Sequence, residues 1–292
     1  MKKIAIIGVG NVGIAAAKAV MLSQDMELCG FIRREAKRVC GFSEIPAAEK
    51  VSDLPRKPDG AIICLPSRLV EKAEAELLKA GIYTVDSFDI HENLLEMRKR
   101  LSFAAEKGKV SAVIGAGWDP GLDSVIRTLM LAAVPQGITY TNFGPGMSMG
   151  HSAAARAVDG VADAISFTLP LGFGKHSRKI YAVLKENADK YAVEHAILSD
   201  EYFEHDGCSI EFADSVKPFF NTSHGVLIER SGNSAGSGSQ RVSFRIAVDN
   251  PSLTGQMMVS AMRAAFLQKP GAYLVPEVSP CDFCGKDWEN FL

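Results

Sequence analysis

The chain has 292 residues, of which 47% are hydrophobic and 23% charged, and its formal net charge is −2. This length favours two domains, and the near-neutral charge argues against a nucleic acid as the main partner. The sequence shows no apolar run of membrane-spanning length, no room for a signal peptide before the first predicted strand and no disulfide framework among its six cysteines, so we expect a cytoplasmic protein with free thiols.

The first predicted strand, turn and helix carry the spacing G-x-G-x-x-G. An apolar run at residues 4–7 meets Gly8, Gly10 and Gly13, and an Ala-rich helical pattern follows. In this context Gly8 permits the turn, Gly10 lets the backbone approach a pyrophosphate, and Gly13 lets the helix pack close to the strand. The helix N-terminus offers N–H groups to the phosphates. The pattern predicts dinucleotide binding, with a tight turn without a ligand as the alternative, through the residues Gly8, Gly10, Asn11, Val12 and Gly13.

Residues 1–117 alternate predicted strands and helices. Strands are expected at Lys3–Gly8, Met26–Ile32, Gly60–Cys64, Tyr83–Asp86 and Val110–Ile114. Helices are expected at Asn11–Ser23, Arg68–Ala80, Glu92–Lys107 and Pro120–Leu131. Apolar strands that alternate with helices indicate a parallel sheet covered on both faces. The sequence therefore predicts an α/β, Rossmann-type doubly wound domain over residues 1–117.

Two arginines follow the second predicted strand, where this fold usually places an acidic residue for the ribose 2′-hydroxyl of NAD. Arg33 and Arg34 stand there instead, and the first acid is Glu35. Guanidinium groups favour a 2′-phosphate, so we expect NADP; an exposed basic turn is the alternative. The end of the third major strand is expected to line the same cleft with Cys64, Leu65, Pro66 and Ser67.

Two acids, Asp89 and Asp119, lie after later strands, where ligands of open α/β sheets bind. Each has a structural alternative: Asp89 with Glu92 resembles a capping box, and Asp119 before Pro120 resembles an N-cap followed by N1. The spacing alone leaves capping and chemistry open. Two carboxylates beside a nicotinamide would suit a cationic substrate group or a water to be activated.

After about residue 135 the pattern changes to strands separated by turns. The expected strands are Thr139–Phe143, Ala164–Pro170, Lys179–Leu184, Ser209–Asp214, Gly225–Glu229 and Arg241–Val248, and the only clear helices are Asn187–Leu198 and Pro251–Leu267. This predicts an α+β domain over 118–269, with a mostly antiparallel sheet and helices on one face. The segment 270–292 is expected to pack back on the first domain.

The C-terminal segment contains a C-x-x-C pair, Cys281 and Cys284. A zinc site would need a second ligand pair of similar spacing, and a redox motif would open a helix after a strand. A small apolar turn is the preferred interpretation, and no metal site is expected.

Three tracts carry a resemblance to a known family. They are G-A-G-W-D-P-G at 115–121, N-F-G-P-G-M-S-M-G-H-S at 142–152 and F-T-L-P at 167–170. Together with the glycine pattern they closely resemble the meso-diaminopimelate D-dehydrogenases, over nearly the whole chain. The resemblance implies NADP-dependent oxidation of the D-centre of meso-2,6-diaminopimelate to an imine, which water hydrolyses to L-2-amino-6-oxopimelate and ammonia. The product cyclises to tetrahydrodipicolinate, and the reverse reaction is a reductive amination that supplies lysine and cell-wall precursor.

The same resemblance implies a homodimer and assigns roles to residues. Asp89 and Asp119 match the acids around the reacting D-centre. The pocket wall there is matched by Trp118, Phe143, Met149 and Gly150. The distal L-centre is matched by Thr168, Arg178, His224 and Asn250. Taken singly, the last three have ordinary structural interpretations as a strand charge, a loop histidine and a helix cap.

Phe143 and Met149 stand where one branch of the family has Trp and Gln, and the stretch 172–178 is short. These features resemble the branch with a more open pocket, which accepts other D-amino acids. Two other functions stay open from the sequence: a neighbouring NADP-dependent reductase of similar architecture, such as a dihydrodipicolinate reductase, and a non-enzymatic nucleotide-sensing protein.

Overall fold

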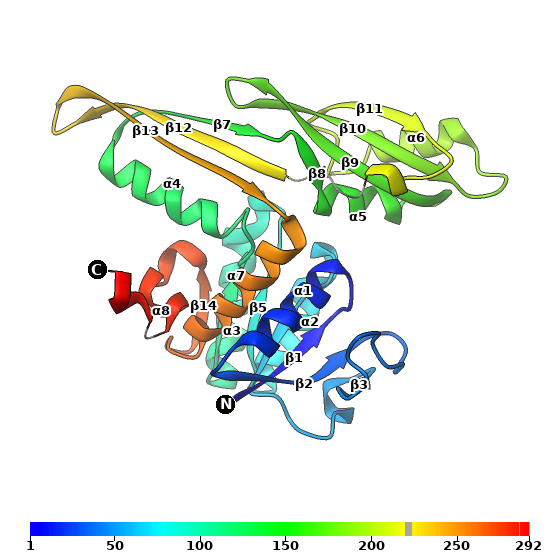
Figure 1. Ribbon diagram of the computed structural model, residues 1–292, viewed down its shortest axis with the longest axis vertical. Coiled ribbons are helices and arrows are strands. Elements are labelled where there is room, and N and C mark those ends of the chain that lie inside the picture. The colour runs from blue at the N-terminus through cyan, green and yellow to red at the C-terminus, as the bar shows by residue number, and fades with distance from the viewer. Residues whose placement is uncertain (220–223, 286, 292) are drawn as a thin grey trace. The chain divides into compact units, whose positions relative to one another are not determined.

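The structure, a computed structural model, describes residues 1–219, 224–285 and 287–291. The chain forms two compact units, one of residues 1–125 with 251–292 and the other of residues 126–250. Figure 1 shows the elements of both. Within the described residues, no helix is long and apolar enough to cross a membrane.

The first unit is built on a seven-stranded sheet in the order β14-β6-β5-β4-β1-β2-β3, and all its pairs are parallel. Its strands are β1 (Lys2–Ile7), β2 (Met26–Ile32), β3 (Ala47–Ala48), β4 (Gly60–Ile63), β5 (Tyr83–Asp86), β6 (Ser111–Ile114) and β14 (Gly271–Leu274). Its helices are α1 (Asn11–Leu22), α2 (Ser67–Lys79), α3 (Leu94–Gly108), α7 (Asn250–Ala265) and α8 (Pro280–Cys284), with short 3₁₀ turns at Val51–Asp53, His91–Asn93, Val275–Glu277 and Asp287–Phe291. The strand order reverses between β1 and β4, and ligands bind at such a switch point, outside the carboxyl ends of the strands.

Helices cover both faces of this sheet, as the apolar strands predict. Side chains of α1 and α7, such as Val20 and Met258, pack with Ile4 and Ile6 on one face. Side chains of α2 and α3 pack with the other face around Ile63. The Rossmann-type fold class predicted from the sequence is confirmed.

Helix α7 is a correction to the expected domain boundary. The sequence pattern places it in the second domain, but it packs in the core of the first unit. Figure 1 shows α7 beside α1, and a Cβ on Gly255 would lie only 2.6 Å from the backbone nitrogen of Ala16. After α7, strand β14 pairs with β6 at the edge of the sheet. The observed boundaries at 125 and 250 therefore differ from the expected 117 and 269.

The second unit contains two sheets. Four strands run in the order β11-β10-β9-β8 and three in the order β13-β12-β7. The strands are β7 (Gln136–Phe143), β8 (Gly146–Ser148), β9 (Val161–Gly172), β10 (Lys175–Leu184), β11 (Gly207–Phe212), β12 (His224–Ser234) and β13 (Ser237–Val248). The helices are α5 (Met149–Ala157) and α6 (Lys190–Leu198), with a 3₁₀ turn at Lys217–Phe219; α4 (Leu122–Ala133) begins in the first unit and ends in the second.

The pairing in these sheets is antiparallel except between β10 and β11. The mostly antiparallel second domain is thus confirmed, although it holds two sheets rather than one. Helix α5 is an element that the sequence analysis missed. Its short sequence, MGHSAAARA, follows directly on β8, so no turn signal separates the two. With α6 it buries Ala155 and Ile197 against Ile180 of β10.

Candidate active site

The turn after β1 contains two glycines that the fold requires and one that it does not require. Gly8 has a φ of +93°, and a Cβ there would lie 2.4 Å from the Cys64 carbonyl oxygen. A Cβ on Gly13 would lie 2.1 Å from the Gly8 carbonyl oxygen. Gly10 has φ −71° and ψ −174°, which any residue adopts, and a Cβ there would meet no atom within 4 Å. Protein packing therefore explains Gly8 and Gly13, whereas the open space at Gly10 fits a bound pyrophosphate.

The residues Asn11 and Val12 form the first turn of α1, and Gly10 is its N-cap, with no side-chain cap. The first amides of this helix therefore have no intrahelical acceptor and are available to a bound phosphate. At the neighbouring strand end, Leu65 is half-buried and Pro66 is exposed. Cys64 donates its backbone N–H to the carbonyl of Ile7, so the two strand ends are joined directly beside the glycines.

Arg33 and Arg34 follow β2 directly, as predicted. Arg34 is exposed, and Arg33 donates to the carbonyl of Lys37 over 3.3 Å. The first acid after them, Glu35, forms an ion pair with Lys37 rather than with either arginine. Both guanidinium groups thus stand at the end of β2 without an ion pair to the nearest acid.

Asp89 follows β5 and is held by α2. Its Oδ1 accepts a hydrogen bond of 2.6 Å from the Ser67 hydroxyl, and its backbone N–H donates to Ser67 Oγ over 3.2 Å. Ser67, which the sequence analysis assigned to the cofactor, therefore orients an acid. The capping interpretation of Asp89 is wrong, because the 3₁₀ turn and α3 that follow begin after Ile90 and Asn93.

Asp119 lies in the segment between β6 and α4, next to the buried Trp118. Helix α4 begins at Leu122, so Asp119 is not its N-cap, and Pro120 is not its first residue. The Asp119 carboxylate is 15% exposed, and its Oδ1 lies 3.7 Å from His91 Nε2. His91 comes two residues after Asp89, so the structure brings the two acid-bearing segments together. The sequence analysis missed His91, and no spacing signal distinguishes it.

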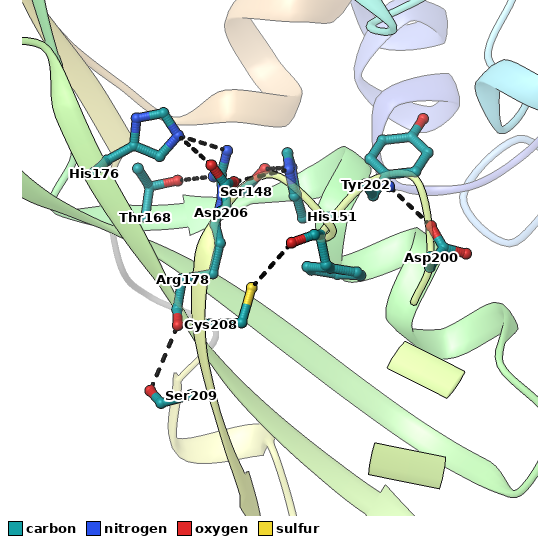
Figure 2. Close-up of polar contacts among 11 residues, drawn as sticks. Ser148, His151, Thr168, His176, Arg178, Asp200, Tyr202, Asp206, Cys208 and Ser209 are labelled. Carbon is teal, nitrogen blue, oxygen red and sulfur yellow. Dashed lines mark hydrogen bonds and ion pairs between the residues drawn. The ribbon is translucent and has the colours of Figure 1, made fainter. Parts of the chain in front are cut away.

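A buried polar cluster in the second unit surrounds Arg178 (Figure 2). Its Nε donates to Asp206 Oδ2 over 2.6 Å, its Nη1 donates to the Thr168 hydroxyl, and its Nη2 lies 3.2 Å from His176 Nε2. Thr168 and Arg178 are direct partners across β9 and β10. Asp206 also lies 3.3 Å from His176 and 3.9 Å from His151. Two predicted residues, Thr168 and Arg178, are thus joined by three that the sequence analysis missed.

Strand register brings the other two predicted distal residues, His224 and Asn250, near each other. His224 begins β12 and pairs with Val248, two residues before Asn250 at the start of α7. Burial and the Arg178 charge lower the pKa of His224 to about 4, so this imidazole is neutral at pH 7. Burial likewise lowers the pKa of His151 to about 3, and the contacts with His176 and Arg178 hold the pKa of Asp206 far below its usual range despite its burial.

The predicted pocket-wall residues of this unit lie close to the same cluster. Phe143, at the end of β7, places its ring 5.8 Å from the ring of His176 in an edge-to-face contact. Met149 and Gly150 open α5, and His151, which contacts Asp206, follows them. The structure therefore gathers Phe143, Met149 and Gly150 around the Arg178 cluster.

Comparison with known proteins gives matches over both units. Residues 2–115 match the oxidoreductase family with an NAD-binding Rossmann fold, and residues 117–174 match the diaminopimelic acid dehydrogenase C-terminal domain. The chain is 40% identical over 296 aligned residues to a meso-diaminopimelate D-dehydrogenase of Bacteroides fragilis, covering 100% of this chain and 99% of that one. The chain belongs to the meso-diaminopimelate D-dehydrogenase family.

Further members of the dehydrogenase family agree with this assignment. The chain is 34% identical to the Lysinibacillus sphaericus enzyme of the same name over 90% of this chain and 88% of that one. A diaminopimelate dehydrogenase of Corynebacterium glutamicum in complex with DAP superposes with a TM-score of 0.86 at 26% identity, covering 99% of this chain and 98% of that one. An engineered D-amino acid dehydrogenase bound to NADP⁺ gives 0.88 at 25% identity with the same coverage. This family membership decides against the neighbouring reductases and the nucleotide sensor.

Proposed function

We propose that this dehydrogenase catalyses the reversible, NADP-dependent oxidative deamination of the D-centre of meso-2,6-diaminopimelate. The products are L-2-amino-6-oxopimelate, which closes to tetrahydrodipicolinate, and ammonia. The observation that carries the proposal is the full-length similarity to the Bacteroides fragilis enzyme. Protein packing does not require a glycine at position 10, and this supports the proposal that the protein binds a dinucleotide there.

The residues around the glycine turn fit a dinucleotide. The pyrophosphate would lie over Gly10 and the amides of Asn11 and Val12, and Arg33 and Arg34 would bind a 2′-phosphate. A carboxylate at the end of β2 would repel that phosphate, and the nearest acid is paired with Lys37. When bound, NADP accepts a hydride from the substrate carbon.

Asp89 and Asp119 would act at the reacting amino group. Two carboxylates stabilise an ammonium ion and the positive charge that develops as the C–H bond breaks. One of them can take the proton that the amine loses and assist the water that adds to the imine. Ser67 orients Asp89 through two hydrogen bonds, and His91 borders Asp119, so the chain holds both acids in place before substrate binds.

Arg178 would bind the distal carboxylate of the substrate. The guanidinium has more N–H donors than its contacts with Asp206, Thr168 and His176 use, so it can still receive a carboxylate. Neutral His224 and the amide of Asn250 would add hydrogen bonds without adding charge. Asp206 fixes the orientation of the guanidinium and offers a negative charge for the distal ammonium group.

We further propose a homodimer in the cytoplasm and a substrate range wider than diaminopimelate. The wider range rests on Phe143 and Met149, which are smaller or less polar than the Trp and Gln that stand there in one branch of the family. Sedimentation or light scattering tests the dimer, and rates with D-alanine test the range. A monomer, or no turnover of D-alanine, would remove the corresponding part of the proposal.

The Asp119→Asn variant tests the catalytic assignment. Asparagine keeps the size of the side chain but cannot accept a proton or stabilise a cation, so we expect kcat/KM for diaminopimelate to fall by roughly 100-fold or more with an unchanged melting temperature. Glu92→Gln is the matched control, because Glu92 is an exposed acid in the neighbouring segment. A fully active Asp119→Asn enzyme would show that Asp119 has no part in the chemistry.

A further inference from the structure

Two carboxyl groups lie fully buried in the first unit, and the mechanism above does not use them. Glu74 is on α2 and Asp86 ends β5, and both are 0% exposed. Burying an isolated carboxylate is very costly, so such groups are either paired or protonated. Their environment shows which of these applies.

Each carboxyl group has one oxygen that receives conventional hydrogen bonds. The Thr84 hydroxyl donates to Glu74 Oε1 over 2.6 Å. Asp86 Oδ1 accepts from the backbone N–H groups of Phe88, at 2.7 Å, and Gly115, at 3.1 Å. The other oxygens, Glu74 Oε2 and Asp86 Oδ2, receive no amide, hydroxyl or amino donor among the described residues.

Thr84 and Asp86 are two residues apart on β5, so their side chains leave the same face of the sheet, and Glu74, which accepts from Thr84, lies beside Asp86 there. The two free carboxyl oxygens have no other donor among the described residues, and a hydrogen bond between them requires a proton on one group, because ionised carboxylates only accept. Burial and the neighbouring Asp86 charge raise the pKa of Glu74 well above its usual range. Burial raises the pKa of Asp86 as well, but Glu74 and the backbone N–H groups of Phe88 and Gly115 act against this rise and favour the ionised form of Asp86. The proton therefore resides on Glu74, with Asp86 as the acceptor.

The other titratable groups near the pair do not neutralise its negative charge. Glu71, one turn earlier on α2, adds negative charge to the surroundings of Glu74 but is itself bound to Arg100 of α3. The Cys64 thiol at the end of β4 is kept neutral by burial and by the Asp86 charge, which raise its pKa.

Asp86 touches both segments that carry the acids of the proposed active site. Phe88, which donates to its carboxylate, directly precedes Asp89. Gly115 and Ala116, which donate to its side chain and its carbonyl oxygen, open the segment that leads to Asp119. Helix α2 also holds Asp89 through Ser67, two turns before Glu74 on the same helix.

We propose that Glu74 and Asp86 share one proton and that this pair positions the two segments carrying Asp89 and Asp119. The positioning part rests on the proposed function of those two acids, whereas the shared proton does not. Glu74 and Asp86 are positioning residues: neither reaches the substrate, and the pair acts by fixing where the two backbone segments leave the sheet.

The test compares Glu74→Gln with Glu74→Leu. Glutamine keeps a donor toward Asp86, whereas leucine has a similar volume but leaves Asp86 Oδ2 without one. We expect Glu74→Gln to keep kcat/KM for diaminopimelate within about twofold and Glu74→Leu to lower it roughly 10- to 100-fold, mainly in kcat, because displaced acids misalign with the reacting centre. Glu76→Gln, at an exposed position of the same helix, is the control.

Two readouts follow the proton without any turnover. The wild-type protein should show the infrared carbonyl band of a protonated, buried carboxylic acid at pH 7, and Glu74→Gln should lack it. Because the folded pKa of Glu74 lies above its unfolded value, its contribution to stability is complete below the unfolded pKa of 4.5 and is lost as the pH rises through the folded pKa. The Glu74→Gln variant should not show this loss of stability as the pH rises.

The outcomes separate the two parts of the proposal. A Glu74→Leu enzyme of wild-type activity would overturn the positioning role. Persistence of the carboxylic acid band in Glu74→Gln, or an activity loss in Glu74→Gln equal to that in Glu74→Leu, would overturn the shared proton. A wild-type protein without diaminopimelate activity would instead refute the proposed function. The infrared band and the pH dependence of unfolding would still test whether Glu74 and Asp86 share a proton.

Discussion

The glycine turn offers a direct comparison between a residue required by the fold and one required by the cofactor. We expect Gly10→Val to fold normally and to lose NADP(H) binding. The backbone of Gly10 is extended, and a Cβ there would meet no protein atom within 4 Å. The only structural cost is a poorer N-cap for α1, about 1 kcal/mol or less.

The loss of binding can be estimated from the contacts that the side chain would block. A charge-assisted hydrogen bond from a helix N-terminal amide to a phosphate is worth about 1.5–3 kcal/mol. Losing two of them at the first turn of α1 amounts to about 3–6 kcal/mol, or roughly two to four orders of magnitude in Kd. Fluorescence titration with NADPH measures this, and thermal unfolding measures the fold.

Gly13→Ala is the matched comparison, because its Cβ would lie 2.1 Å from the Gly8 carbonyl oxygen. That variant should lose stability as well as cofactor binding, since α1 must move away from the turn. If Gly10→Val binds NADPH as tightly as wild type, the open space at Gly10 is not the pyrophosphate site. If Gly10→Val unfolds like Gly13→Ala, the distinction between the two glycines is wrong.

Three further predictions concern the residues proposed to bind the cofactor and the distal end of the substrate. Replacing Arg33 and Arg34 together by alanine should weaken NADP by roughly 10- to 150-fold and NAD far less, and equal losses in Kd would show that they do not bind the 2′-phosphate. Arg178→Ala should raise KM for diaminopimelate about tenfold or more but leave D-alanine kinetics nearly unchanged, since D-alanine has no distal carboxylate; equal effects would make Arg178 structural. Because the pKa of His224 falls from 6.5 to about 4 on folding, its neutral form should contribute about 3 kcal/mol above pH 6.5 that is lost as the pH falls through 4. Urea unfolding of wild type and His224→Gln between pH 7 and 4 checks this. The same change of unfolding free energy with pH in both proteins would refute it.

The first unit could be predicted closely because its signals are local. Apolar strands, glycine helix ends and the glycine turn each depend on neighbouring residues, and β2 and β5 have the predicted bounds. Helix α7 was assigned to the wrong unit because sequence order does not say which core a helix joins. That placement depends on the close approach of Gly255 to α1, which is a tertiary contact.

The sequence analysis named two residues of the buried Arg178 cluster but missed the side chains that join them. Arg178 and Thr168 follow from the family motifs, but Asp206 becomes their neighbour only through the parallel pairing of β10 with β11. From the sequence, Glu74 is an ordinary polar residue of an amphipathic helix, and only the structure shows that it is buried and accepts a hydrogen bond from Thr84, two residues before Asp86. The capping alternatives for Asp89 and Asp119 failed because α3 and α4 begin later than the sequence signals suggest.

One measurement tests the central claim most directly. The purified protein is given meso-, LL- or DD-diaminopimelate with NADP or NAD, and initial rates of reduced cofactor formation are recorded. The account predicts the highest kcat/KM with the meso isomer and NADP, no oxidation of the LL isomer, which lacks a D-centre, and a lower rate with NAD. Oxidation of the LL isomer at a comparable rate, or no cofactor reduction with the meso isomer, would contradict it.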